Sequence, residues 1–319
     1  FTGSTMGTTY QVKLVTGYFD GPKGLQQRVD ERLKQINQSM STYLPDSEIS
    51  RFNNLSATGE QFAISGDFLQ VMRTARRIFE LSDGAWDATV NPIVQLWGFG
   101  SGQNKPGIPD KNELQDQLQR VGFDFIRILD SGALVKMQPA VSLDLGAIAK
   151  GFGVDQIAAL LKAEGHTDFL VEIGGEVFAA GKRIDGKPWR IGVNDPDKDA
   201  PLTRVYRVAE LTNRAMATSG DYRNFVEIDG RLYSHVIDPR TGYPVDNGVV
   251  SVTVIADNCT LADGLATAVM VMGHNKGLSL VESLQNVESL VIVHEPDGTF
   301  TDHVSSGFPP DIFHTPPAK

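Results

Sequence analysis

The chain has 319 residues, 41% of them hydrophobic, which is enough to bury one large core or two smaller ones and excludes a disordered or fibrous protein. No run approaches the roughly 18 consecutive apolar residues of a membrane span, and a net charge of -10 with 29 scattered basic residues argues against a nucleic-acid partner. The single cysteine, Cys259, excludes an intramolecular disulfide framework and a four-cysteine zinc site.

Strands and helices alternate irregularly in the first half of the chain. The predicted elements there are an extended segment over residues 8–16, a helix over 22–40, a helix that follows Ser65 and ends near 82–84, a polar helix over 111–121, and a hairpin of strands 125–129 and 133–137. A loop carrying aromatic residues follows the second helix, and the Gly- and Pro-rich run 98–109 is typical of a long surface connection.

The second half is richer in strands. The predicted elements are a strand over 141–145, a helix from there to residue 163, strands over 169–173, 176–180, 189–193, 204–211, 225–228, 233–237 and 249–256, helices over 260–272 and 275–284, and strands over 289–293 and 300–303. This order predicts an α/β or α+β protein with mixed sheets and packed helices. No sharp boundary divides it, so we expect a single domain over 1–319, in one or two lobes, with a ligand cleft between lobes if there are two.

Residues 142–153, SLDLGAIAKGFG, lead from a predicted strand through a glycine turn to a helix N-terminus. Unpaired N–H groups and the helix dipole favour an anion there, so a diphosphate would fit. Lys150 could add a point charge, and Asp144 could accept a hydrogen bond from a ligand. The alternative is that the small residues only allow tight strand–helix packing, because the glycines match neither a dinucleotide nor a Walker fingerprint.

A second group of polar residues lies on the helix that begins near Leu261. Asp263 and Thr267 are four residues apart, which places a carboxylate and a hydroxyl on one helix face. Both are hard oxygen donors of the kind that Mg²⁺ binds, together with waters and substrate phosphates. The alternative is an acidic residue stabilised by the helix dipole and a threonine packed inward.

Three further features are weaker when taken singly. His235, in a predicted strand before a Pro- and Gly-containing turn, could act as a general base, although an isolated histidine is more often a hydrogen-bonded core residue. The run 217–224, ATSGDYRN, offers hydroxyls and Arg223 to a phosphate, or is simply a turn. Tyr43 and Trp86 offer faces to a flavin or adenine ring, or pack in a core.

Taken together, these segments resemble the ApbE family of FAD:protein FMN transferases. The likeness runs from Thr5 to about Gly273 and follows the order of that family's motifs. The motifs are TMGT at 5–8, STY at 41–43, DGAWDATVNPIVQLWGFG at 83–100, SLDLGAIAKG at 142–151, VEIGGEV at 171–177, ATSGDYRN at 217–224, SHVIDPRTGYPV at 234–245 and the helix over 262–270.

The resemblance assigns roles to individual residues. It implies flavin contacts at Met6, Tyr43, Ala85, Trp86, Asp87, Asp144, Lys150 and Ile237. It also implies a Mg²⁺ site made by Asp263, Thr267 and Ala147, the last through its backbone carbonyl, which agrees with the helical spacing. It further implies a T-fold-like architecture. Asp263 is then a catalytic residue as a metal ligand, and His235 is our hypothesis for the base.

The activity implied is Mg²⁺-dependent transfer of FMN from FAD to a Thr or Ser of a target protein through a phosphoester, with release of AMP. Two alternatives stay open: a hydrolase that cuts FAD to FMN and AMP, and a flavin-binding protein without catalysis. The resemblance also implies acceptor proteins among the flavin-carrying subunits of membrane redox complexes. With the missing initiator methionine, it leads us to expect a periplasmic protein anchored to the inner membrane as a lipoprotein.

Overall fold

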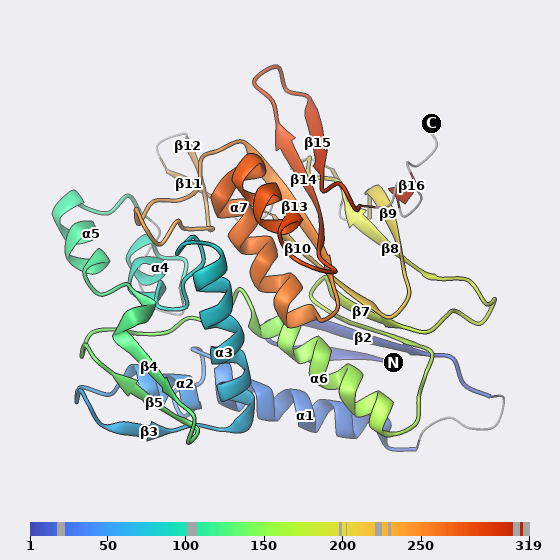
Figure 1. Ribbon diagram of the computed structural model, residues 1–319, viewed down its shortest axis with the longest axis horizontal. Coiled ribbons are helices and arrows are strands. Elements are labelled where there is room, and N and C mark those ends of the chain that lie inside the picture. Colours follow the sequence, from blue (N-terminus) through green and yellow to red (C-terminus); the bar gives the residue numbers. More distant parts are fainter. Residues whose placement is uncertain are drawn as a thin grey trace.

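The computed structural model describes residues 1–17, 23–100, 107–197, 200–201, 203–220, 225–228, 231–308 and 313–314. Its centre is an eight-stranded sheet in which every neighbouring pair of strands is antiparallel (Figure 1). In spatial order the strands are β1 (Thr2–Thr5), β2 (Thr8–Leu14), β6 (Phe169–Ile173), β7 (Glu176–Ala180), β10 (Arg214–Gly220), β13 (Val249–Ala256), β14 (Glu288–His294) and β15 (Phe300–Val304).

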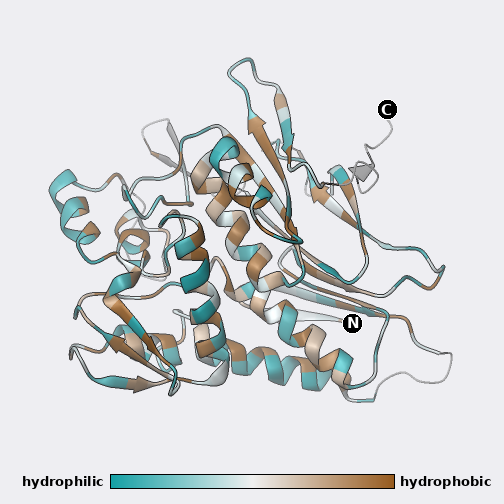
Figure 2. Cartoon of the chain, viewed as in Figure 1, coloured by the Kyte–Doolittle hydropathy of each residue, from teal (hydrophilic) through white to brown (hydrophobic). Residues whose placement is uncertain are grey.

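Both faces of this sheet are buried, because alternate residues of its inner strands enter different cores. In β7, Phe178 joins the large core under the helices, whereas Val177 joins a second core that includes Trp189. The second core is closed by the three-stranded sheet of β8 (Trp189–Asn194), β9 (Val205–Leu211) and β16 (Phe313–His314). Figure 2 accordingly shows hydrophobic residues along much of the central sheet.

Helices cover the other face of the sheet. The two that contact it most are α6 (Ala149–Ala163), against β6 and β7, and α7 (Cys259–Glu282), against β10 and β13. Two more form an outer layer, with α1 (Leu25–Met40) on α6 and α3 (Gly66–Leu81) on α7 (Figure 1). This layering brings the N-terminal turns of α6 and α7 close to one another.

The remaining elements are short helices and short strands. They are α2 (Glu48–Asn53), α4 (Asn91–Trp97), α5 (Lys111–Leu118), the 3-10 turn η1 (Phe123–Phe125), the sheet of β3 (Gln61–Ala63), β5 (Ala133–Lys136) and β4 (Ile126–Leu129), and the hairpin of β11 (Phe225–Ile228) and β12 (Arg231–Ser234). No helix of the described ranges has both the length and the apolar character that a membrane crossing requires.

Local sequence explains where the helices begin and break. The Ser65 side chain accepts a hydrogen bond from the Phe68 N–H and so caps α3. Gly273, with φ 78° and ψ 166°, interrupts α7, and the Asn247 side chain donates to the Met270 carbonyl just before the break. The prediction of two helices meeting near residue 273 is therefore confirmed.

The mixed α and β fold with several sheets is confirmed, and since the large sheet is antiparallel it is of the α+β kind. The hairpin of 125–129 and 133–137 is confirmed as β4 and β5. The single domain, with one or two lobes, and the cleft between lobes stay predictions.

Four local predictions are wrong. Residues 141–145 form no strand: they are extended, but the Leu143 backbone bonds the Asn53 side chain instead of a neighbouring strand. His235 is not inside a strand but follows the end of β12. Residues 217–220 belong to β10 and not to a turn, and α4 occupies part of the expected aromatic loop. Tertiary partners outweighed the local signals at 141–145, where Asn53 bonds the backbone, and at 217–220, where β13 pairs with β10.

Candidate active site at the start of α6

The segment that precedes α6 is held on both sides. Asp144 Oδ1 accepts a hydrogen bond from the Gly146 N–H at 2.7 Å, which shapes the turn into the helix. The Asp144 N–H donates to the Ala88 carbonyl at 2.7 Å, so the loop over 85–88 lies beside this turn. Burial raises the pKa of the Asp144 carboxyl, and the Gly146 N–H partly offsets that effect.

The first turn of α6 is bonded directly to α7. The Gly151 N–H donates to Asp263 Oδ2 at 2.8 Å, whereas in a helix begun one turn earlier it would donate to the carbonyl of Ala147. A Cβ atom at Gly151 would lie 2.3 Å from the Cys259 carbonyl oxygen, so only glycine allows this approach. In return, Asp155 of α6 accepts from the N–H groups of Cys259 and Thr260, both at 2.8 Å.

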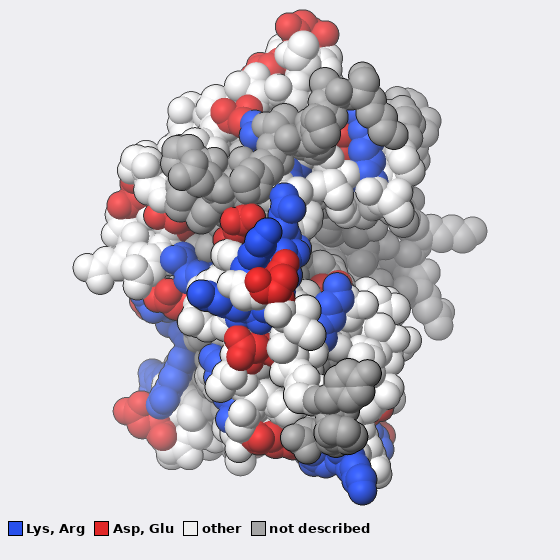
Figure 3. Space-filling model, turned by 90° about the vertical axis from the view of Figure 1, so that its right-hand side faces the viewer, with Lys and Arg blue, Asp and Glu red and all other residues white. Residues whose placement is uncertain are grey.

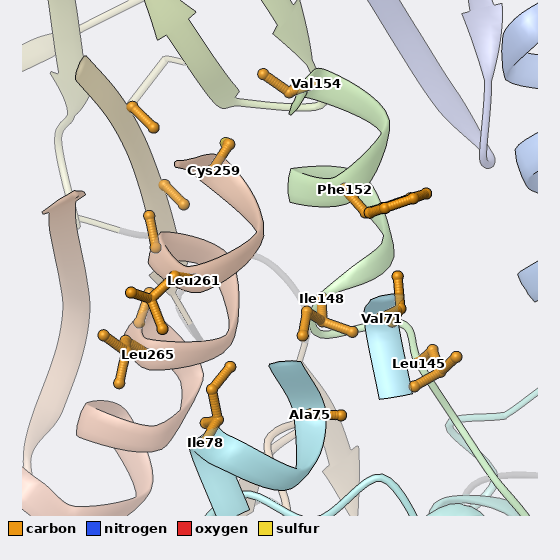
Figure 4. Close-up of a cluster of buried hydrophobic side chains, with 14 of the residues drawn as sticks. Val71, Ala75, Ile78, Leu145, Ile148, Phe152, Val154, Cys259, Leu261 and Leu265 are labelled. Atoms are coloured by element: carbon orange, nitrogen blue, oxygen red, sulfur yellow. The ribbon is translucent and has the colours of Figure 1, made fainter. Parts of the chain in front are cut away.

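These bonds make each helix cap the other, with a carboxylate of one on the N-terminal N–H groups of its partner. Figure 4 shows the apolar side of the same junction, where Ile148 lies between α7 and α3 and Ile78 of α3 points toward α7, while Phe152 points away from α7 on the other side of α6. Buried apolar packing and exchanged capping bonds together fix the relative position of the two helix starts.

An ammonium and two carboxyl groups gather at this junction. Lys150 Nζ donates to Glu176 Oε1 at 2.6 Å, and the Glu176 side chain is 2% exposed. Burial raises the pKa of Glu176 to about 8, with a further contribution from the negative charge of Asp263, in spite of the opposing effect of Lys150. Burial also raises the pKa of the Asp263 carboxyl, against the effects of Lys150 and the Gly151 N–H.

The charge of Lys150 itself is preserved. Its burial alone would lower the pKa, but the negative charges of Glu176 and Asp263 raise it by more, so the net pKa lies above the ordinary lysine value. The junction therefore holds one cation and up to two anions, and a further positive charge would be favourable there once both carboxyl groups are ionised.

Three oxygen donors at the junction fit a hard cation. Asp263 is 4% exposed and one of its two oxygens is occupied by Gly151. Thr267 lies one turn further along α7, where its hydroxyl is 2.9 Å from that of Ser219. The Ala147 carbonyl is on the turn that leads into Gly151. Carboxylate, hydroxyl and carbonyl oxygens with waters suit Mg²⁺. No group of three His, Cys, Asp or Glu side chains suited to a metal occurs among the described residues.

Met6 reaches the same helix from the β1–β2 hairpin. The hairpin turns through Met6 and Gly7, which have φ values of 50° and 72°, the left-handed pair that a two-residue turn requires. A Cβ atom at Gly153 would lie 3.0 Å from Met6 Cε, so the methionine packs against the first half of α6.

The loop over 85–87 is largely an internal structure. Ala85 is 1% and Trp86 is 3% exposed, and Trp86 Nε1 has no hydrogen-bond partner in the described part of the chain. Asp87 is 6% exposed, and its carboxylate accepts from the Thr89 N–H and hydroxyl and from the Phe123 N–H. The Asp87 side chain is thus committed to the fold, and only its backbone is left for a ligand.

The remaining predicted residues lie on other loops. Tyr43, between α1 and α2, is 73% exposed, whereas Ile237 is 6% exposed and packs with Trp97. His235 is half-buried after β12. A Cβ atom at Gly84 would lie 3.9 Å from Arg240 Cγ, so the turn after Ile237 borders the loop over 83–87. Arg223 lies outside the described residues.

Three residues of the junction are absent from the predicted set: Glu176, Asp155 and Ser219. Lys150 and Thr267, the partners of Glu176 and Ser219, were predicted, whereas Cys259 and Thr260, the partners of Asp155, were not. A partner on another strand or helix has no signature in linear spacing. The only signal was the acid after the two glycines of VEIGGEV.

On the face shown in Figure 3, acidic and basic side chains are intermingled. At the site itself, Lys150 and the first N–H groups of α6 are the local groups that would hold an anionic ligand. Two surface hollows, one near His166 and one near Arg76, are lined by none of the predicted site residues.

Known proteins are similar to this chain over nearly its whole length. The ApbE family model matches residues 6–291. The chain is 44% identical over 310 residues to the FAD:protein FMN transferase of Vibrio cholerae, covering 97% of this chain and 91% of that protein. It is 40% identical to that of Haemophilus influenzae, covering 96% and 89%. Among solved structures, Vibrio cholerae flavin transferase ApbE matches with TM-score 0.88 at 42% identity over 97% of both chains. The apo Pseudomonas stutzeri flavinyl transferase ApbE matches with TM-score 0.86 at 38% identity over 97% and 94%.

Proposed function

Because the chain belongs to the ApbE family, we propose that it transfers FMN from FAD to a Thr or Ser hydroxyl of a target protein in a Mg²⁺-dependent reaction. The acceptor oxygen bonds to the phosphorus on the FMN side of the diphosphate, the bond from that phosphorus to the AMP oxygen breaks, and AMP leaves. The observation that carries the proposal is the Gly151–Asp263 bond, which joins the predicted phosphate-binding helix start to the predicted metal-binding helix.

In this proposal, different residues bind the cation, the diphosphate and the flavin. Asp263, Thr267 and the Ala147 carbonyl would hold the cation, which when bound supplies neutralisation of the diphosphate charge. Lys150 and the first N–H groups of α6 bind and orient the anionic part of FAD. Met6, Tyr43, the backbone of 85–87, Asp144 and Ile237 would contact the flavin half, as in the predicted set.

The proton of the acceptor hydroxyl has to leave as the new bond forms. We propose that His235 accepts this proton as the general base, since an imidazole ordinarily exchanges protons near neutral pH. Replacing His235 by Ala should reduce flavin transfer by at least about 100-fold, the usual contribution of a general base, while FAD binding persists. A variant that retains full transfer would remove His235 from the mechanism.

AMP release from FAD tests cofactor, metal and bond cleavage together. Purified protein with FAD and Mg²⁺ should release AMP, and a chelator should stop the release until Mg²⁺ is added back. The matched variant Asp263→Asn should behave like the chelated protein. If the protein binds FAD but releases no AMP with any added metal ion, that result would instead support the non-catalytic alternative.

The fate of the flavin separates transferase from hydrolase. With a Thr-bearing acceptor protein present, mass spectrometry should find the acceptor heavier by FMN less water. Free FMN in the same amount as AMP, with an unmodified acceptor, would favour hydrolysis of FAD.

The cellular setting extends the proposal. We propose that the acceptors are flavin-carrying subunits of membrane redox complexes and that the protein acts in the periplasm, held at the inner membrane by a lipid anchor. The support is the family resemblance. Fractionation of cells that express the full-length protein tests it, and recovery in the cytosol would contradict it.

A further inference from the structure

The ammonium at the start of α6 is held by a second, independent element. Lys150 is the second residue of α6, and its Nζ lies 2.6 Å from Glu176 Oε1, at the start of β7. The Lys150 side chain is 31% exposed, whereas that of Glu176 is 2% exposed. The ammonium is therefore anchored by Glu176, and the lysine side chain that carries it is partly accessible to solvent.

Glu176 is a rigid anchor. It pairs with Ile173 directly after the Gly174–Gly175 turn, whose φ values of 60° and 105° suit glycine, so the backbone that carries it is fixed within the β6–β7 hairpin. Thr8 and Lys150 also leave no room at Gly174, where a Cβ atom would lie 2.8 Å from Thr8 Cγ2. The carboxyl group thus has little freedom to move away from the lysine.

The second oxygen of Glu176 is the unusual feature. Oε2 is buried and has no hydrogen-bond partner within the described ranges. A buried polar atom without a partner costs about 1–3 kcal/mol, and such an atom in a folded protein commonly marks a functional constraint. A buried ion pair is often no more stabilising than apolar residues of similar volume, so stability alone does not account for this pair.

The opposite end of α6 offers a comparison. There Glu164, the C-terminal capping residue, pairs with Arg28 at 2.6 Å, and the two side chains are 24% and 46% exposed. Exposed pairs of this kind contribute little to stability, and neither partner is near the helix start. The two pairs on one helix are therefore matched in chemistry but differ in burial and in place.

We propose that Glu176 is a positioning residue for the flavin-transfer reaction, which holds the Lys150 ammonium at the start of α6 against the anionic part of the substrate. This inference rests on the proposed function, because that function places the FAD diphosphate at this helix start. Glu176 acts through Lys150 and needs no contact with the substrate itself.

A double-mutant cycle tests the inference. The variants are Glu176→Leu, Glu176→Gln, Lys150→Met and the double variant Glu176→Leu/Lys150→Met, with Glu164→Gln as the matched control. Loss of a hydrogen bond to a charged group corresponds to about 10- to 100-fold, so Glu176→Leu and Lys150→Met should each raise KM for FAD by that factor, with a smaller change in kcat. Glu176→Gln keeps an acceptor oxygen and should recover most of the loss.

The decisive value is that of the double variant. If Glu176 acts through Lys150, the double variant should be no worse than Lys150→Met alone, and Glu164→Gln should match the unmodified protein. FAD binding followed by flavin fluorescence should show the same pattern without turnover. Multiplying effects in the double variant, or an unchanged KM in a folded Glu176→Leu, would overturn the inference. If Glu176→Leu fails to fold, Glu176→Ala, which also removes the acceptor oxygens, takes its place in the cycle. An unmodified protein that releases no AMP would instead defeat the proposed function.

Discussion

At the scale of single residues, the Asp87 carboxylate forms hydrogen bonds that hold its own loop in place. Its two oxygens accept three hydrogen bonds, which tie the loop over 85–89 to Phe123. Burial raises the pKa of Asp87, and the bonds from Thr89 and Phe123 lower it again in part. A residue that the family resemblance predicts to contact the flavin is thus also a structural centre of its loop.

Replacing Asp87 by Ala should lower the free energy of unfolding by about 2–4 kcal/mol, because three donors lose their buried acceptor. The control is Asp124→Ala, which removes a carboxylate that is 87% exposed and pairs with Arg76 at the surface. That change should cost under about 1 kcal/mol. Urea unfolding measures both, and equal effects would contradict the assignment.

Glu176 gives the stability a pH dependence. Its pKa is raised from 4.5 to about 8 in the folded chain, so the folded state binds a proton that the unfolded state has lost. This stabilisation is complete below about pH 4.5 and disappears as the pH rises through about 8. The melting temperature should fall over that window, and it should fall less in Glu176→Gln. A fall of equal size in the two proteins would show that other groups cause it.

At the scale of elements, the junction of α6 and α7 is built from exchanged N-terminal caps. Asp263 accepts a hydrogen bond from one backbone N–H of α6, and Asp155 accepts hydrogen bonds from two backbone N–H groups of α7. Each helix start is left with positive character that a carboxylate of the other relieves. Because these bonds join α6 to α7, they also set how far the Ala147 carbonyl lies from Asp263 and Thr267.

Adding a methyl group at Gly151 should force the helices apart, because the new Cβ would lie 2.3 Å from the Cys259 carbonyl. We expect Gly151→Ala to lower the free energy of unfolding by about 1–3 kcal/mol. We also expect it to raise the Mg²⁺ concentration that AMP release requires. Gly66→Ala, at the start of α3, is the control, since nothing lies within 4 Å of its Cβ position. It should leave both the stability and the Mg²⁺ titration near those of the unmodified chain.

At the scale of the whole molecule, one core crosses the boundary between the sheet and the outer helices. The large core contains Val171 of the sheet, Leu265 of α7 and Phe68 of α3. The elements beyond α3 join it through Phe52. The large core therefore runs through both parts, beside two smaller clusters, one that includes Trp189 and one that includes Trp97.

The chain should therefore unfold in one cooperative step. Scanning calorimetry should give a calorimetric enthalpy equal to the van't Hoff enthalpy, and fluorescence and circular dichroism should share one midpoint. Two separated transitions would show that the parts fold independently and would favour the two-lobed description.

Much of this arrangement is encoded locally and could be predicted. The helical spacing of Asp263 and Thr267, the cap at Ser65 and the break near Gly273 are set by neighbours in the chain, and the structure has them as expected. The motif order was sufficient to identify the family. Short-range rules account for these features because each depends on residues within about one helical turn.

Other features were decided by the tertiary structure alone. Residues 141–145 have a strand-like sequence but bond to Asn53 and to the loop at Ala88 instead of a neighbouring strand. The partners Glu176 of Lys150 and Asp155 of Thr260 come from other elements, 26 and 105 residues away along the chain. The pKa values at the junction depend on burial and on charges across those distances, which only the folded chain creates.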